Sequence, residues 1–337
     1  MSSDKRFETG AGEAPDSTPE PAIPQQPNPS PETSDTTVTP PPAFNPFTEI
    51  RSGEKPRIAR GVSSLLQDVL GRHQTVQGYC LLAILDEHTS IASYDLDRIY
   101  AGLKAQNEHR QKDVLLLLLS TGGEIEPAYQ ISKLCRSFSK SKFVVAVPRY
   151  AKSAATLIAL GADQIHMGQL GHLGPIDPQF GGLPGLAVAR ALDTLAELVE
   201  RHPKSADMLS RYLKDKLPVQ QIGYYDRVAE SAVQYAQRLL SSKNREVLAG
   251  TPEALAHALV HDYKDHGFVI DFDEATLKLG GEWISQGTPE ILFAEEVYDL
   301  YNTISFVLRQ TRQKKLALIG SLTNDDMERS LLLLNDE

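Results

Sequence analysis

The most constraining feature of the chain is an unbroken apolar run, Val114–Leu119, within the segment DVLLLLLST (113–121). A run without alternating polar residues is typical of a strand that is buried on both faces of a sheet, because helices then cover both sides. The run is far shorter than the roughly 20 residues that a membrane-spanning helix needs. Gly122-Gly123 follows at once and ends the strand. The run therefore predicts a central strand in a layered fold.

Similar apolar segments flank this strand and alternate with amphipathic ones. The pattern predicts strands at 78–86, 142–150 and 164–168, and helices at 93–106, 124–138 and 153–162. Such alternation is typical of right-handed strand–helix–strand crossovers, so the predicted fold class is α/β. The second half is mainly helical, with helices predicted at 186–200, 204–215, 226–240, 252–263 and 290–312 and a short strand at 268–270. These helices form either an outer layer or an oligomer interface.

Residues 1–47 differ in composition from the rest of the chain. They hold 11 of the 21 prolines and seven acidic residues against Lys5 and Arg6, and so carry half of the net charge of −10. Such a segment cannot bury enough apolar surface to offset its chain entropy, which predicts a disordered tail. The triplet Pro40–Pro42 is compatible with an SH3-like groove, although a solvated linker is the simpler interpretation.

Charge and cysteine content exclude several classes of function. An acidic chain without a basic block is a poor partner for nucleic acid, whose binding begins with the neutralisation of phosphates. The two cysteines, Cys80 and Cys135, lie in apolar segments and are too few for a metal-ligand set, so buried free thiols in a reducing compartment are expected. With no apolar segment after Lys5-Arg6 that would direct secretion, the expected location is cytoplasmic. No cofactor is expected.

Two predicted strand ends carry residues that are suited to chemistry. In open α/β sheets, ligands bind beyond the carboxyl ends of the strands. At the first strand end, the glycines of STGG (120–123) allow backbone N–H groups to turn towards a ligand. At the second, Ser153 stands at a strand-to-helix elbow, where a hydroxyl and the next backbone N–H can face the same space. Taken alone, a serine at this place is more often a helix cap, and a glycine pair is most often a simple turn.

The two strand ends occur in one order with a third segment, LGPIDPQ (173–179). Together with VPRYAKSAATLIALGADQIHMG (147–168), they resemble the serine dehydrogenase proteinase family, in the wider group that contains ClpP and signal peptide peptidase A. A weaker similarity extends over 265–280. The resemblance implies a ClpP/crotonase-like spiral of ββα units with a helical C-terminal portion. The expected domains are the tail (1–47), the peptidase domain (48–285) and a C-terminal helix and short strand (286–337) used in packing or oligomerisation.

The resemblance also implies roles for individual residues. Ser153 matches the nucleophile, Gly123 matches a glycine whose N–H forms half of the oxyanion hole, and the N–H of Ala154 would form the other half. Gly122 and Asp177 would shape the site. The chain departs from the family pattern at Ala155, where glycine is usual.

The general base is left open by the sequence. The ClpP histidine position falls near Pro175, so a triad of that form is not expected. Signal peptide peptidases use a downstream lysine, which makes Lys204 a candidate; a lysine whose pKa is lowered by burial can act as a base. His172 is the alternative. His266 matches a histidine of the family's C-terminal segment but receives no role from the sequence. Lys152 adjoins the serine, and its side chain is expected to diverge from it.

The leading functional hypothesis is a serine peptidase that forms an acyl-enzyme at Ser153. Two alternatives are a catalytically silent scaffold subunit and a crotonase-type acyl-CoA enzyme. By resemblance, the expected partners are peptides or unfolded proteins and further copies of the chain. Because the chain lacks a phosphate-binding loop, ATP-driven unfolding would need a separate partner. Membrane association through a partner is left open by the sequence.

Overall fold

The apolar run at 114–119 lies in the centre of a mixed sheet. The computed structural model describes residues 43–180, 183–216, 219–323 and 326–335, so most of the predicted tail lies outside the described residues. The run forms strand β2 (Val114–Ser120), and every residue of β2 is buried. The main path of the sheet has the order β11-β10-β1-β2-β3-β5-β9. The central position explains why the strand needs no polar face.

Parallel pairing dominates the part of the sheet around β2. From β1 (Cys80–Asp86) through β2, β3 (Phe143–Val147) and β5 (Gln164–Met167) to β9 (Ile284–Ser285), each strand is parallel to the next on this path. β10 (Lys314–Ser321) is antiparallel to β1, and β11 (Leu331–Asn335) is antiparallel to β10. Where the sequence predicts one short strand near the C-terminus, the structure has two strands, β10 and β11, and both extend the main sheet.

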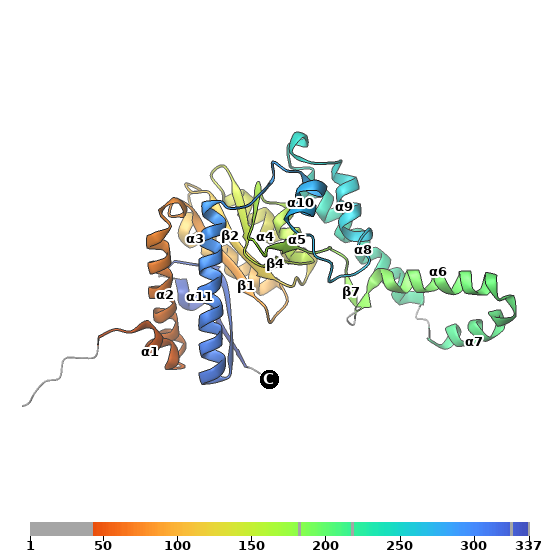
Figure 1. The fold of residues 1–337 in the computed structure, drawn as a ribbon, viewed down its shortest axis with the longest axis horizontal. Coiled ribbons are helices and arrows are strands. Elements are labelled where there is room, and N and C mark those ends of the chain that lie inside the picture. The colour runs from red at the N-terminus through yellow and green to blue at the C-terminus, as the bar shows by residue number, and fades with distance from the viewer. Residues whose placement is uncertain (1–42, 181–182, 217–218, 324–325, 336–337) are drawn as a thin grey trace, which may run out of the picture. The chain divides into compact units, whose positions relative to one another are not determined.

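Helices cover both faces of the sheet, as the continuous apolar run predicts. Along β2, Leu116 and Leu118 pack into one core with α3 (Ser93–Asn107), α4 (Ile125–Phe138) and α5 (Ala154–Leu160). Leu115, Leu117 and Leu119 pack into the opposite core. That core holds α2 (Lys55–Arg72) and α11 (Pro289–Arg312), which lie side by side on this face (Figure 1). Burial of each leucine contributes about 1.5–3 kcal/mol.

Several short elements complete the described chain. Near the carboxyl ends of the strands, β4 (Tyr150–Ala151) pairs with β2 and with β6 (His172–Leu173), while β7 (Gln179–Phe180) pairs with β8 (Leu183–Pro184). The remaining helices and 3-10 helices are α1 (Pro46–Arg51), η1 (Gln74–Val76), α6 (Gly185–Arg201), η2 (Pro203–Ser205), α7 (Ala206–Lys216), α8 (Val219–Leu240), η3 (Arg245–Val247), α9 (Pro252–His261), α10 (Phe272–Leu279) and α12 (Met327–Ser330).

The α/β class with a helical portion in the second half is confirmed. The short strand predicted at 268–270 was wrong in extent, because only Ile270 forms a bridge, to Leu173 of β6. This bridge connects the segment after α9 to the edge of the site described below. Among the described residues, no helix is both long and apolar enough to cross a membrane.

Candidate active site

Ser153 occupies a backbone conformation that few residues adopt. Its φ is +52° and its ψ is −121°, at the sharp turn between β4 and the first residue of α5. A non-glycine residue in this region costs of order 1–3 kcal/mol and persists only where the surroundings enforce it. Within the described chain, the Ser153 side chain makes no capping hydrogen bond to α5, so a role as helix cap does not explain the strained conformation. The turn therefore has the geometry of a nucleophile elbow.

Hydrogen bonds hold this elbow from both sides. The N–H of Lys152 donates to the carbonyl of Ser120 (3.0 Å), and the N–H of Ser153 donates to that of Pro175 (3.1 Å). The buried hydroxyl of Thr156 reaches the carbonyls of Ala151 (2.7 Å) and Gly174 (2.8 Å). The end of β2 and the LGPIDPQ segment are thus both tied to the serine.

Gly122 and Gly123 lie against the elbow where no side chain fits. A Cβ atom at Gly122 would lie 2.7 Å from the Cβ of Ser153, and one at Gly123 would lie 2.3 Å from the backbone nitrogen and oxygen of Ile91. Both glycines have positive φ, +110° and +155°. The pair is therefore required both by its conformation and by the close approach of other backbone segments.

Two backbone amides at this turn have no acceptor within the described chain. The N–H of Gly123 lies between hydrogen bonds made by its neighbours, and the N–H of Ala154 is the first of α5, ahead of the helical hydrogen-bond ladder. Gly123 and Ser153, the residue before Ala154, contribute to the walls of one cavity. Unpaired N–H donors of this kind can stabilise a negatively charged oxygen.

The cavity has a volume of about 590 Å³ and opens beside Ser153. Its lining comes from the β2–α4 turn, the LGPIDPQ segment, α8 and the segment after α9: Ser90, Thr121, Gly122, Gly123, Glu124, Ile125, Glu126, Ser153, Ile176, Pro178, Tyr224, Val228, Ser231 and His266. A volume of this size is within the usual range for ligand sites.

His266 and Asp177 form a pair at this cavity. Nδ1 of His266 lies 2.7 Å from Oδ1 of Asp177, whose carboxylate is buried, while the imidazole is 26% exposed. His266 lines the cavity together with Ser153. A carboxylate on Nδ1 selects the tautomer in which Nε2 carries a lone pair, which is the arrangement of a general base.

The two bases predicted from the sequence lie elsewhere. Lys204 is exposed within η2, and it does not line the cavity. His172 is in β6, where its Nδ1 lies 3.4 Å from the carbonyl of Leu170 and its Nε2 is buried without a hydrogen-bond partner in the described structure. Burial lowers the pKa of His172. His172 is likewise not a residue of the cavity wall.

Other residues singled out in the sequence have structural surroundings. The methyl group of Ala155 is buried in the core of α5 and does not line the cavity, so the departure from glycine leaves the pocket open. The ammonium of Lys152 lies over the ring of Tyr150. Burial raises the pKa of Cys80 to about 12 and also raises that of Cys135, so both thiols are unreactive at neutral pH. Among the described residues, no cluster of three or more metal-ligating side chains occurs.

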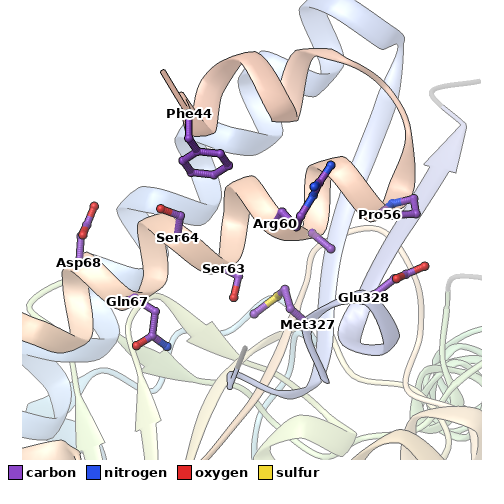
Figure 2. Close-up of a pocket in the computed structure, with 10 residues that line it drawn as sticks. Phe44, Pro56, Arg60, Ser63, Ser64, Gln67, Asp68, Met327 and Glu328 are labelled. Atoms are coloured by element: carbon purple, nitrogen blue, oxygen red, sulfur yellow. The ribbon is translucent and has the colours of Figure 1, made fainter. Parts of the chain in front are cut away.

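A second cavity, of about 610 Å³, is lined by Phe44, which precedes α1, and by residues of α2 and α12 (Figure 2). Phe44, Arg60, Gln67 and Met327 are among its lining residues. Its walls hold the carboxylates of Asp68 and Glu328 but no histidine, and none of its lining residues belongs to the turns around Ser153. Size alone therefore does not identify the candidate site; the combination of side chains and strained backbone does.

The sequence drew attention to His266 but did not predict its contact with Asp177. The similarity over 265–280 included this histidine, and Asp177 was expected to shape the site. Their pairing depends on the bridge between Leu173 and Ile270, which joins segments almost 100 residues apart. No local pattern reveals such a long-range contact.

Comparison with known proteins supports the resemblance inferred from the sequence. Residues 86–204 match the family described as ClpP-like SDH-type serine proteinase, which confirms the resemblance over that segment. The segment includes Gly123, Ser153 and Asp177 but ends before His266. At the level of the family, the match supports a serine peptidase.

Two uncharacterised proteins of Methanocaldococcus jannaschii are also similar. MJ0137 is 29% identical over 205 residues, which are 60% of this chain and 62% of that protein. MJ1495 is 37% identical over 75 residues, which are 22% of this chain and 26% of that protein. The chain thus spans about three-fifths and one-quarter of their lengths.

Two solved structures resemble the chain at low sequence identity. Both are mutants of a 1510-N membrane-bound stomatin-specific protease. A serine-to-alanine mutant has a TM-score of 0.39 and 14% identity, covering 72% of this chain and 91% of that one. A lysine-to-alanine mutant in complex with a substrate peptide has a TM-score of 0.39 and 15% identity, covering 76% and 87%.

Proposed function

We propose that this chain, whose residues 86–204 match the ClpP-like SDH-type serine proteinases, hydrolyses peptide bonds through an acyl-enzyme at Ser153. The observation that carries the proposal is the strained elbow: Ser153 has a φ of +52° beside two amides without acceptors, in one cavity with a histidine–aspartate pair. Each feature has a structural explanation when taken alone. Their convergence favours acyl transfer.

The proposed reaction uses the described groups in sequence. Nε2 of His266 accepts the proton of the Ser153 hydroxyl as Oγ attacks the carbonyl carbon of the substrate. The N–H groups of Gly123 and Ala154 donate to the oxygen that becomes negative, and Asp177 stabilises the imidazolium. The C–N bond then breaks, the leaving amine takes the proton from His266, and an ester to Ser153 remains. Water, deprotonated by the same imidazole, hydrolyses this ester and restores the serine.

His266 is favoured over Lys204 and His172 because it alone of the three lines the cavity with Ser153. An exposed lysine outside the cavity does not meet the requirement that a base lie within hydrogen-bond reach of the proton it removes. The two alternative functions become outcomes of the test. A silent scaffold would neither react nor cleave, and an acyl-CoA enzyme would bind coenzyme A without needing Ser153.

The test combines a fluorophosphonate probe, which reacts with activated serines, with hydrolysis of an unfolded protein such as casein. We expect labelling and cleavage by the unmodified chain and neither by Ser153→Ala. His266→Gln is expected to lower the labelling rate by about 10²-fold or more, whereas Lys204→Ala and His172→Ala, as matched controls, leave it unchanged. Cleavage that survives Ser153→Ala, or that requires Lys204 but not His266, would overturn the proposal.

A further inference from the structure

One residue outside the β2–α4 turn holds both sides of Gly123. The N–H of Ile91 donates to the carbonyl of Gly122 (2.8 Å), and the N–H of Glu124 donates to the carbonyl of Ile91 (2.8 Å). Ile91 is buried and pairs with Gly123 as an isolated parallel bridge. The direction of the Gly123 N–H is therefore set by the position of Ile91.

Ile91 belongs to the connection between β1 and α3, and a buried carboxylate holds the end of that connection. Oδ2 of Asp95 accepts the N–H of Ala92, the residue after Ile91, at 2.9 Å. Asp95 is only 1% exposed. Its Oδ1 is also buried and has no hydrogen-bond partner within the described chain. A half-satisfied buried carboxylate is costly, so this group is poorly explained as a stability device alone.

A second buried aspartate holds the beginning of the same connection. Oδ1 of Asp86 accepts the N–H groups of His88 (2.8 Å) and Thr89 (3.1 Å), and Oδ2 accepts the hydroxyl of Thr89. These bonds order the turn but end before Ile91. Of the two aspartates, only Asp95 binds the residue next to Ile91, namely Ala92. Ile91 in turn makes the backbone hydrogen bonds on both sides of Gly123.

We propose that Asp95 is a positioning residue for the oxyanion hole: by fixing the N–H of Ala92, it fixes Ile91 and through it the amide of Gly123. This inference rests on the proposed function, since it assigns a task to the Gly123 amide. The simpler alternative is a helix cap, because an acidic side chain at this place in the first turn stabilises α3. The two roles differ in whether catalysis changes when the fold does not.

The charge environment of Asp95 adds a pH dependence. Burial raises the pKa of Asp95 to about 6, with smaller raising effects from Asp86 and Glu124, while the hydrogen bond from Ala92 and the nearby Arg98 lower it. Above pH 6 the carboxylate is ionised and is a strong acceptor. Below pH 6 it takes up a proton and binds the N–H of Ala92 less tightly.

The test uses three variants of the whole chain. Asp95→Ala removes the acceptor, and Asp95→Asn keeps an oxygen that can accept the N–H of Ala92 but removes the charge. Asp97→Ala, an exposed carboxylate on the same helix, is the control. We expect Asp95→Ala to lower kcat for a peptide substrate about 10–100-fold, somewhat less than the loss of a whole oxyanion donor, with KM within about two-fold. Asp95→Asn, which keeps only an uncharged and weaker acceptor, should lower kcat several-fold at pH 7.5, to a value between those of Asp95→Ala and the unmodified chain, and Asp97→Ala should match the unmodified chain.

Two readouts separate this inference from a structural role and from the proposed function. If Asp95→Ala does not fold, the pH profile of Asp95→Asn decides: kcat of the unmodified chain should fall more steeply below pH 6 than that of Asp95→Asn. Superimposable profiles, or a kcat of folded Asp95→Ala equal to that of Asp97→Ala, would overturn the inference. If the unmodified chain itself is inactive and resists the fluorophosphonate, the proposed function fails first.

Discussion

Replacement of Gly122 by alanine tests whether the glycine turn sets the geometry of the serine. The added Cβ would lie 2.7 Å from the Cβ of Ser153 and 2.8 Å from the carbonyl oxygen of Lys152. Ordinary contact begins near 3.4 Å, so one of the two backbones must move by about 0.7 Å. Neither neighbour is the flexible end of a side chain, and the φ of +110° adds strain of about 1–3 kcal/mol.

The expected effect on catalysis is larger than the effect on folding. A displacement approaching 1 Å at a reacting group can cost about 10²-fold in rate. We therefore expect Gly122→Ala to lower the fluorophosphonate labelling rate by about 10²-fold and Tm by several degrees. Gly71→Ala, in α2, is the matched control because its Cβ would meet nothing within 4 Å. Labelling of Gly122→Ala at the rate of Gly71→Ala would refute the assignment of this turn to the site.

Three further predictions concern stability. Ser153→Gly should be inactive yet more stable than Ser153→Ala by about 1 kcal/mol, because only glycine relieves the positive φ; equal Tm values in calorimetry would show that the elbow is unstrained. The hydrogen bond from His166 lowers the pKa of Glu290 to about 2, so its ionised form stabilises the fold above about pH 4.5, and this stabilisation is lost as the pH falls towards 2. Glu290→Gln should accordingly show a shallower decline of Tm over that range, and parallel curves would contradict the shift. Burial lowers the pKa of Lys243 to about 8, so between about pH 8 and 10.5 the unfolded chain binds more protons than the folded chain, and the free energy of unfolding should rise with pH over this window. In denaturant unfolding, Lys243→Met should not show this rise. The same pH dependence in Lys243→Met and the unmodified chain would contradict the lowered pKa.

The sequence predicted the layered core well because its signals are local. Six apolar residues in a row define β2, and the glycine pair and the serine elbow each follow a strand that the apolar pattern predicts. The extension of the sheet by β10 and β11 was not foreseen, because strand pairing across more than 200 residues leaves no local trace. The apolar pattern of Leu331–Leu334 alone does not say which strand it joins.

The candidate site was predicted in part for the same reason. Gly123 and Ser153 each follow a predicted strand end, and pairing of β2 with β4 brings these ends together, so that both residues line one cavity, with Ala154 next to Ser153 in the chain. The base was expected at Lys204, because of its separation from Ser153 along the chain, or at His172, which lies in the glycine-rich connection near the predicted site. His266 reaches the cavity through a single backbone bridge at Ile270, and its partner Asp177 comes from a different turn.

The most direct test of the central claim is the site and rate of fluorophosphonate modification, measured by mass spectrometry of the digested protein. We expect a single adduct on the peptide containing Ser153, formed about 10²-fold more slowly in His266→Gln and at an unchanged rate in Lys204→Ala. An adduct at any other serine, or a rate that depends on Lys204 and not on His266, would contradict it.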